Sequence, residues 1–138
     1  YGDPRWNADE LWTTMGHLYQ GGMWFKKKSV LQADHHYDTE KSADGTTDMR
    51  TTYKYYSNNS SSSILPSAAD AGNYFYLPAL GYYNSGQLHG VGTYGYYWSS
   101  SASPSVSYRA YYLTISSDYV LLYSYLHRNN GFMVGGFK

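Results

Sequence analysis

The 138 residues are enough for one domain with a single core, and no cysteine is present to supply disulfides or thiolate ligands. Ten basic and ten acidic side chains cancel, which argues against a partner that is nucleic acid or an anionic membrane surface. No apolar run reaches the roughly 18–20 residues of a membrane helix, and no signal-peptide pattern opens the chain, so we expect a mature or excised piece without direct membrane insertion.

Tyrosine dominates the aromatic residues, with 19 Tyr against four Phe and four Trp. A buried phenol hydroxyl needs a hydrogen-bond partner, so a protein that used aromatic rings only to fill its core would favour Phe. Tyr together with Ser, Gly and Asn is the chemistry of antibody paratopes. The composition therefore predicts a contact surface rich in tyrosine.

Residues 7–19 carry the pattern of an amphipathic helix near the N-terminus. Asn7 can cap this helix, and Glu10 can reach back as in a capping box. Gly21-Gly22 would end it. Four apolar residues fall at helical spacing on one side: Leu11, Met15, Leu18 and Tyr19.

The middle of the chain predicts long irregular loops with one strand. Residues 29–48 are polar and rich in turn formers, and residues 58–63 form an Asn/Ser run. Residues 73–83 form an apolar, aromatic stretch that Pro78 interrupts, so they can form a short strand that runs into a bend. Residues 84–86, Asn-Ser-Gly, then predict a turn.

The C-terminal third predicts a small twisted antiparallel sheet. Tyr111, Leu113 and Ile115 alternate with polar or aromatic neighbours, which is the period of a strand with one buried face. Residues 119–123 would return antiparallel after a turn at Asp118, and residues 131–134 would add a last strand. We expect Trp98 and Val120 to point inward with the first set of residues.

Four blocks in this order carry a family resemblance: LPALGY at 77–82, GYYWSS at 95–100, AYYLTI at 110–115 and RNNGFMV at 128–134. The series resembles the LPAAGYR, GYYWSST, AYYLxF and RxxGFSVR blocks of a bacterial surface-domain family. That family has the C-type-lectin-like, or formylglycine-generating-enzyme-like, fold and often hosts the variable proteins of diversity-generating retroelements. Two departures are Gly135-Gly136 in place of an Arg-containing ending and Leu80 in place of a small residue.

The resemblance implies an α+β fold for a single domain over residues 1–138, with a variable region at about residues 104–130. Residues 104–130 contain no Lys, Glu, Gln, Met or Trp, the types that adenine-directed variation of Asn codons does not produce. The ligand-binding face would consist of Ser107, Tyr108, Tyr112, Thr114, Ser116, Tyr119, Leu121, Tyr123, Ser124, Tyr125, Leu126 and His127.

The function implied is recognition of a protein or surface-glycan ligand, by a phage tail receptor-binding protein or a bacterial surface adhesin, without an enzymatic reaction or a cofactor. The localisation would be extracellular, on a bacterial cell surface or a phage particle, and the resemblance alone implies a homo-oligomer, a trimer. The alternatives are an enzyme on the same fold, a hydrolase or an oxidase, and a structural module without diversification.

Two metal hypotheses are weaker than their alternatives. His35-His36, with Asp34 and Asp38, offers nitrogen and oxygen ligands, but neighbouring residues of an extended segment point apart, so a solvated turn is favoured over a metal site. Calcium-dependent sugar binding would need triplets such as EPN, QPD or WND, and none occurs. We therefore expect no metal.

Overall fold

The computed structural model describes residues 2–37, 41, 46–48, 50–52, 56–58, 62–102, 110–123 and 133–134, and these form mainly β-strands. The strands are β1 Arg5–Thr14, β2 His17–Lys26, β3 Tyr56–Asn58, β4 Tyr74–Pro78, β5 Tyr82–Asn84, β6 Gln87–His89, β7 Tyr94–Ala102, β8 Ala110–Ser116, β9 Val120–Tyr123 and β10 Met133–Val134. Helical structure in this part of the chain is confined to α1, Lys28–Ala33, and the 3-10 turn η1, Ala71–Asn73. The expectation of an α+β, C-type-lectin-like fold with an N-terminal helix is therefore wrong, and the described chain is a β protein.

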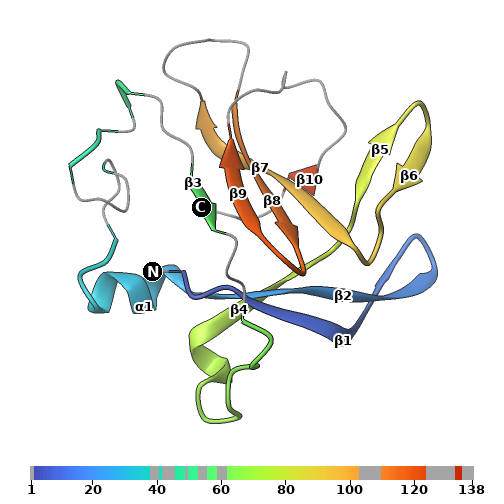
Figure 1. Ribbon diagram of the computed structural model, residues 1–138, viewed down its shortest axis with the longest axis horizontal. Coiled ribbons are helices and arrows are strands. Elements are labelled where there is room, and N and C mark those ends of the chain that lie inside the picture. The colour runs from blue at the N-terminus through green and yellow to red at the C-terminus, as the bar shows by residue number, and fades with distance from the viewer. Residues whose placement is uncertain are drawn as a thin grey trace.

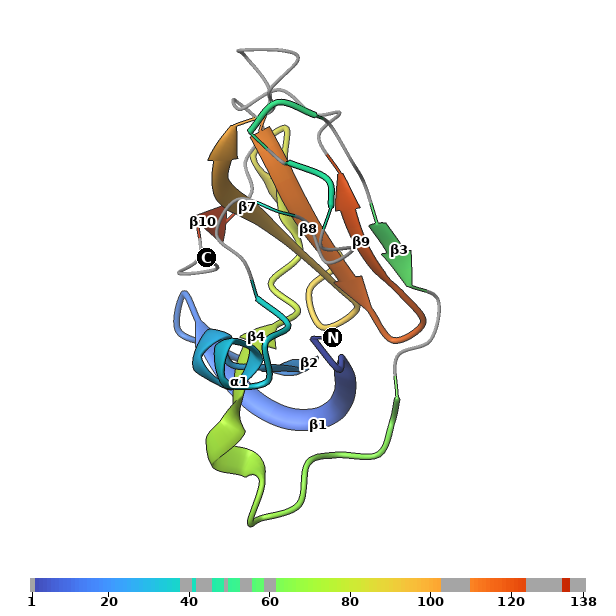
Figure 2. The same cartoon turned by 90° about the vertical axis from the view of Figure 1, so that its left-hand side faces the viewer.

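Two sheets form the body of the domain, as Figures 1 and 2 show. The first sheet is antiparallel with the order β1-β2-β4, and the second has the order β10-β7-β8-β9-β3. In both views the second sheet lies across the first, and Figure 1 shows the β5–β6 hairpin to the right of the second sheet. No helix of the described residues is long and apolar enough to cross a membrane.

The main core lies between the two sheets. It joins residues of β2 and β4 to residues of β7 and β8. Met23 and Ile115 are completely buried at its centre. The buried members of the core are Met23, Phe25, Leu77, Tyr97, Leu113 and Ile115. Burial of large side chains from both sheets is the main force that holds the sheets together.

The segment predicted as a helix is instead the β1–β2 hairpin. Its loop consists of Met15 and Gly16, both with positive φ (51° and 77°), between the paired residues Thr14 and His17. Two positive φ values define the two-residue turn whose twist matches that of the flanking strands. The four apolar residues at helical spacing therefore do not share a buried stripe, and Leu11, Met15 and Leu18 are exposed by 59%, 70% and 64%.

Asn7 makes the contacts expected of a helix cap, but inside a strand. Its side-chain oxygen accepts hydrogen bonds from the backbone N–H groups of Asp9 (3.1 Å) and Glu10 (3.0 Å). These bonds close a turn inside the strand, and the turn forms a bulge. Asn7 pairs with Gly22 and Leu11 pairs with Gln20, so the β1 segment between these pairs is longer than the facing β2 segment. The capping signal was thus a local turn signal, which a bulge satisfies as well as a helix does.

The C-terminal sheet agrees with the expectation from the sequence in most respects. β8 pairs antiparallel with β7 and with β9, and Tyr111, Leu113 and Ile115 are buried, which confirms both the strands and that buried set. β10 is the exception, because it pairs parallel to β7. The strand at 74–78 and the turn at Ser85-Gly86 are also confirmed.

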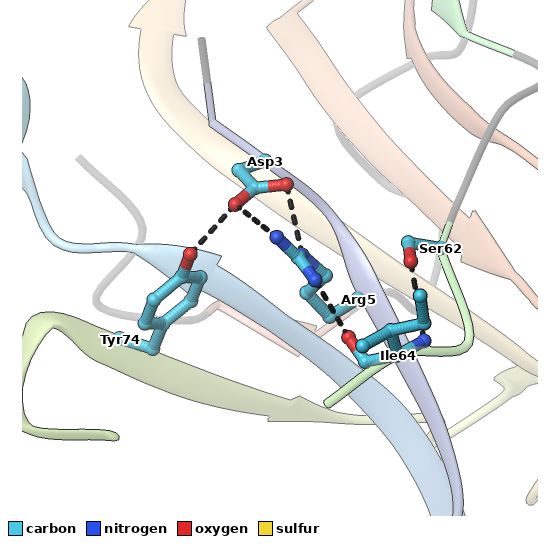
Figure 3. Close-up of polar contacts among 5 residues, drawn as sticks. All are labelled: Asp3, Arg5, Ser62, Ile64 and Tyr74. Carbon is cyan, nitrogen blue, oxygen red and sulfur yellow. Dashed lines mark hydrogen bonds and ion pairs between the residues drawn. The ribbon is translucent and has the colours of Figure 1, made fainter. Parts of the chain in front are cut away.

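A polar cluster ties the N-terminal segment to the rest of the first sheet (Figure 3). Arg5 donates two hydrogen bonds of 2.9 Å to the Asp3 carboxylate and one of 2.8 Å to the Ile64 carbonyl. The Tyr74 hydroxyl donates to the same carboxylate at 2.6 Å. These bonds lower the pKa of Asp3, chiefly through Arg5, while burial and the neighbouring carboxylate raise the pKa of Tyr74. The cluster therefore has a structural role, because it fixes the N-terminal segment to β4 and to the segment at Ile64.

Candidate functional site

The predicted ligand-binding face is buried where it crosses β8. Tyr112, Thr114 and Ser116 are exposed by only 9%, 4% and 3%. The expectation that these three side chains point into solvent is therefore wrong. Both faces of β8 are covered, since its alternate residues Leu113 and Ile115 are buried in the main core.

Trp98 explains part of this burial. It lies directly opposite Tyr112, and opposite residues of an antiparallel pair point to the same face. The two rings meet edge to face, with centroids 6.0 Å apart and planes at 75°. Together with Ala110 and the partly buried Tyr96 they form a second core on the outer face of the sheet. Trp98 is thus buried, as expected. The expectation that it points to the same side as Leu113 is wrong, because Trp98 lies on the opposite face of the sheet.

The remaining predicted site residues divide into two groups. Tyr119 and Leu121 are partly buried, and Tyr123 belongs to β9, where its backbone pairs with that of Tyr112. The others lie outside the described residues: Ser107, Tyr108, Ser124, Tyr125, Leu126 and His127. Asp38 of the weaker metal hypothesis also lies outside them, whereas His35 and His36 are exposed next to α1.

A different set of aromatic side chains gathers where the β5–β6 hairpin meets the outer face of β7. We call Tyr82, His89, Tyr94, Tyr96 and Tyr119 the tyrosine cluster. Tyr82 stacks on His89 (centroids 5.5 Å apart, 26° between planes) and meets Tyr96 edge to face (5.0 Å, 71°). Tyr94 lies 6.4 Å from Tyr96 and is 36% exposed.

Tyr119 joins the cluster from the turn before β9. Burial is the main cause that raises the pKa of Tyr96, and the nearby phenol of Tyr119 is the next, followed by those of Tyr82 and Tyr94. The raised pKa keeps the Tyr96 hydroxyl protonated near neutral pH. A protonated phenol such as that of Tyr96 can both donate and accept hydrogen bonds.

Glycines place the β5–β6 hairpin against β7. Gly81 (φ 68°) donates from its N–H to the Tyr94 carbonyl at 2.7 Å and forms a parallel bridge with Gly95. A side chain at Gly81 would collide with the His89 carbonyl. The close approach of these backbones brings Tyr82 onto Tyr96, so the geometry of the cluster depends on glycine at this position.

An open groove of about 410 Å³ lies between the β1–β2 hairpin and the loop before β7. Its lining residues are Leu11, Leu18, Tyr19, Gln20, Val91, Gly92 and Thr93. The backbone of the lining residue Gly92 lies close to that of Gly21, since a Cβ on Gly21 would lie 2.6 Å from the Gly92 carbonyl oxygen. This groove was not predicted from the sequence, because Leu11 and Leu18 were expected on one side of a helix. The one local signal for the hairpin is the glycine at position 16, between two runs that contain aromatic residues and threonine.

No group of three or more His, Asp or Glu side chains that could hold a metal ion occurs among the described residues. Tyr76 has the one buried side-chain hydroxyl in this part of the chain for which no hydrogen-bond partner is found, and burial raises its pKa to about 12. The Tyr76 hydroxyl packs over Gly22, and a Cβ added to Gly22 would collide with it. Packing against this glycine therefore explains the position of the hydroxyl.

The comparisons with known proteins identify a family. The family described as "Domain of unknown function (DUF8237)" matches residues 20–137. The chain belongs to the DUF8237 family. Neither a curated protein nor a solved structure matches it. The DUF8237 match includes all five residues of the tyrosine cluster and the loop at 91–93 that lines the groove.

Proposed function

We propose that this DUF8237 domain binds a macromolecular ligand, a protein or a surface glycan, through the tyrosine cluster and without catalysing a reaction. The observation that carries the proposal is the gathering of Tyr82, Tyr94, Tyr96 and Tyr119 around one end of the second sheet. Tyrosine offers a large amphipathic contact at low cost in side-chain entropy.

Three features support a role in binding. The cluster is held by strands and glycine contacts, so its rings lose little freedom when a ligand binds. The whole chain has a formal net charge of zero, which fits recognition by local contacts. Aromatic residues are also enriched at protein interfaces.

We further propose, on the resemblance of the four sequence blocks, that the domain is displayed on a bacterial cell surface or a phage particle and is diversified by a retroelement. The burial of Tyr112, Thr114 and Ser116 restricts this proposal, because packed positions tolerate little change in volume. Sister copies of the gene should therefore vary at the codons of Tyr119 and Leu121 and not at those three. Invariant codons at Tyr119 and Leu121 would contradict diversification.

A binding experiment tests the proposed face. The labelled domain is applied to an array of immobilised bacterial surface polysaccharides and to intact bacterial cells, beside a Tyr94→Ala/Tyr119→Ala variant. We expect the variant to bind at least about tenfold more weakly, equivalent to about 1.4 kcal/mol. Tyr83→Ala is the matched control, because Tyr83 is equally exposed (38%) and follows Tyr82 directly, on the other face of β5. Equal loss in both variants, or no loss in either, would contradict the assignment.

A further inference from the structure

β1 is an outermost strand of the first sheet, and its far side from β2 is only partly covered. At its start the segment around Ser62 pairs with it, through Trp6 N–H to Ser62 O (2.8 Å) and Ser62 N–H to Pro4 O (3.1 Å). Beyond the bulge, residues 11–14 pair only with β2 within the described part of the chain. Figure 1 shows this stretch of β1 along the lower border of the molecule.

The register fixes which backbone groups face outward. In a two-residue hairpin the closing pair, here Thr14 and His17, exchanges hydrogen bonds, and the pairs then alternate along the ladder. Trp12 and Tyr19 therefore form the next hydrogen-bonded pair. The N–H and C=O groups of Leu11 and Thr13 point away from β2, and no described residue outside the hairpin bonds to them.

β1 carries a bulge and the exposed charges of Asp9 and Glu10 before Leu11, but residues 11–14 themselves have none of the usual protection of edge strands. Natural proteins place Lys, Pro or inward-pointing charges on such edges to prevent pairing with another chain. Residues 11–14 read Leu-Trp-Thr-Thr, without charge or proline, and Leu11 is 59% exposed. The zero formal net charge of the chain also provides no long-range repulsion between copies.

We propose that two copies of this chain dimerise by antiparallel pairing of residues 11–13 of β1 about a twofold axis at Trp12. Leu11 of each copy then exchanges two hydrogen bonds with Thr13 of the other, which satisfies all four outward groups of each strand. The two three-stranded sheets become one continuous sheet. Pairing of like strands about such an axis is self-complementary, as a closed dimer requires.

The two Trp12 residues lie opposite each other across the axis in this arrangement, with each indole ring over the β2 strand of its own chain. Opposite residues of a pair without hydrogen bonds have Cβ atoms about 4.5–5.5 Å apart, so rings that lie over β2 leave room for the partner strand. Trp12 is already held in place, since its Nε1 donates to the Gly21 carbonyl at 2.8 Å and its ring lies 5.1 Å from that of Tyr19. Dimerisation therefore orders little that is not ordered in the single chain.

A second copy fits this edge because residues 11–13 carry no charge and no proline, and because one twofold axis lets both copies use the same outward groups. It also presents the same apolar Leu11 to the shared face. A foreign extended peptide, or the homotrimer that the family resemblance implies, is an alternative outcome of the test.

The test is sedimentation of the full chain at concentrations into the millimolar range. We expect a monomer–dimer equilibrium for the natural chain and for Thr13→Val, which keeps the outward N–H. Thr13→Pro removes that donor without touching the ladder to β2 and should weaken dimerisation at least about tenfold, with an unchanged circular dichroism spectrum.

Leu11→Lys is the second variant. It tests the proposal if Thr13→Pro does not fold. It places a charge on the edge and should also yield monomers. A natural chain that stays monomeric or sediments as a trimer, or a folded Thr13→Pro or Leu11→Lys variant that dimerises as tightly as the natural chain, would overturn the proposal.

Discussion

β8 and β1 differ strongly in how far their residues are buried. β8 is a central strand whose two neighbours and two covered faces leave its seven residues, Ala110–Ser116, buried. β1 has one sheet neighbour, a bulge and a turn with two positive φ values, and most of its distal half is exposed. This difference indicates that side-chain volume decides which substitutions β8 tolerates. In the β1–β2 hairpin the backbone conformation decides which substitutions are tolerated.

The largest effect should come from removing a ring that β8 buries. Tyr112→Ala deletes a side chain packed against Trp98 and should lower the free energy of unfolding by about 3 kcal/mol, as for other buried aromatic residues. Tyr94→Ala, on the same face of the neighbouring strand but 36% exposed, should cost less than about 1 kcal/mol. Chemical denaturation of both variants measures the contrast, and equal losses would contradict it.

A smaller effect should come from the glycines of the β1–β2 hairpin. Gly21→Ala combines a positive φ of 99° with a collision against the Gly92 carbonyl and should cost about 2–3 kcal/mol. Gly16→Ala has a similar φ of 77° but open space around the new methyl group, so it should cost only about 1 kcal/mol. Thermal unfolding of the two variants separates the collision from the conformational cost, and identical losses would show that the backbone contact is absent.

The smallest expected effect is an increase in stability. Met15 adopts a φ of 51°, which asparagine tolerates better, and Asn-Gly is the preferred sequence of such a turn. Met15→Asn should raise the free energy of unfolding by about 0.5–1 kcal/mol. The same change inside a helix would lower stability, because Asn is a poor helix former. A loss on denaturation would therefore favour a helix at residues 7–19.

How far the sequence could predict this domain differs between these regions. Alternation at residues 111–115 identified β8 and its main-core residues correctly, because a period of two has no helical equivalent. Residues 7–19 satisfied helical spacing by coincidence, since the Asn7 turn and the Met15-Gly16 turn each change the phase of the strands. Alternation also could not show that the second face of β8 is covered, because that cover includes Trp98 from another strand.

The tyrosine cluster was predictable only in part. The excess of tyrosine indicated a contact surface, and Tyr119 was among the predicted contact residues. Tyr82, Tyr94 and Tyr96 were not, because their meeting depends on Gly81 bringing the β5–β6 hairpin onto β7, a contact between distant backbones that no local pattern encodes.

The central claim is that Tyr111 and Tyr112 of β8 are buried, whereas Tyr94 of the tyrosine cluster, at the start of β7, is exposed. Nitration of the folded domain with tetranitromethane, followed by mass spectrometry of its peptides, tests this directly. We predict early modification of Tyr94 and protection of Tyr111 and Tyr112 until the domain unfolds. Modification of Tyr112 as fast as that of Tyr94 would contradict the account.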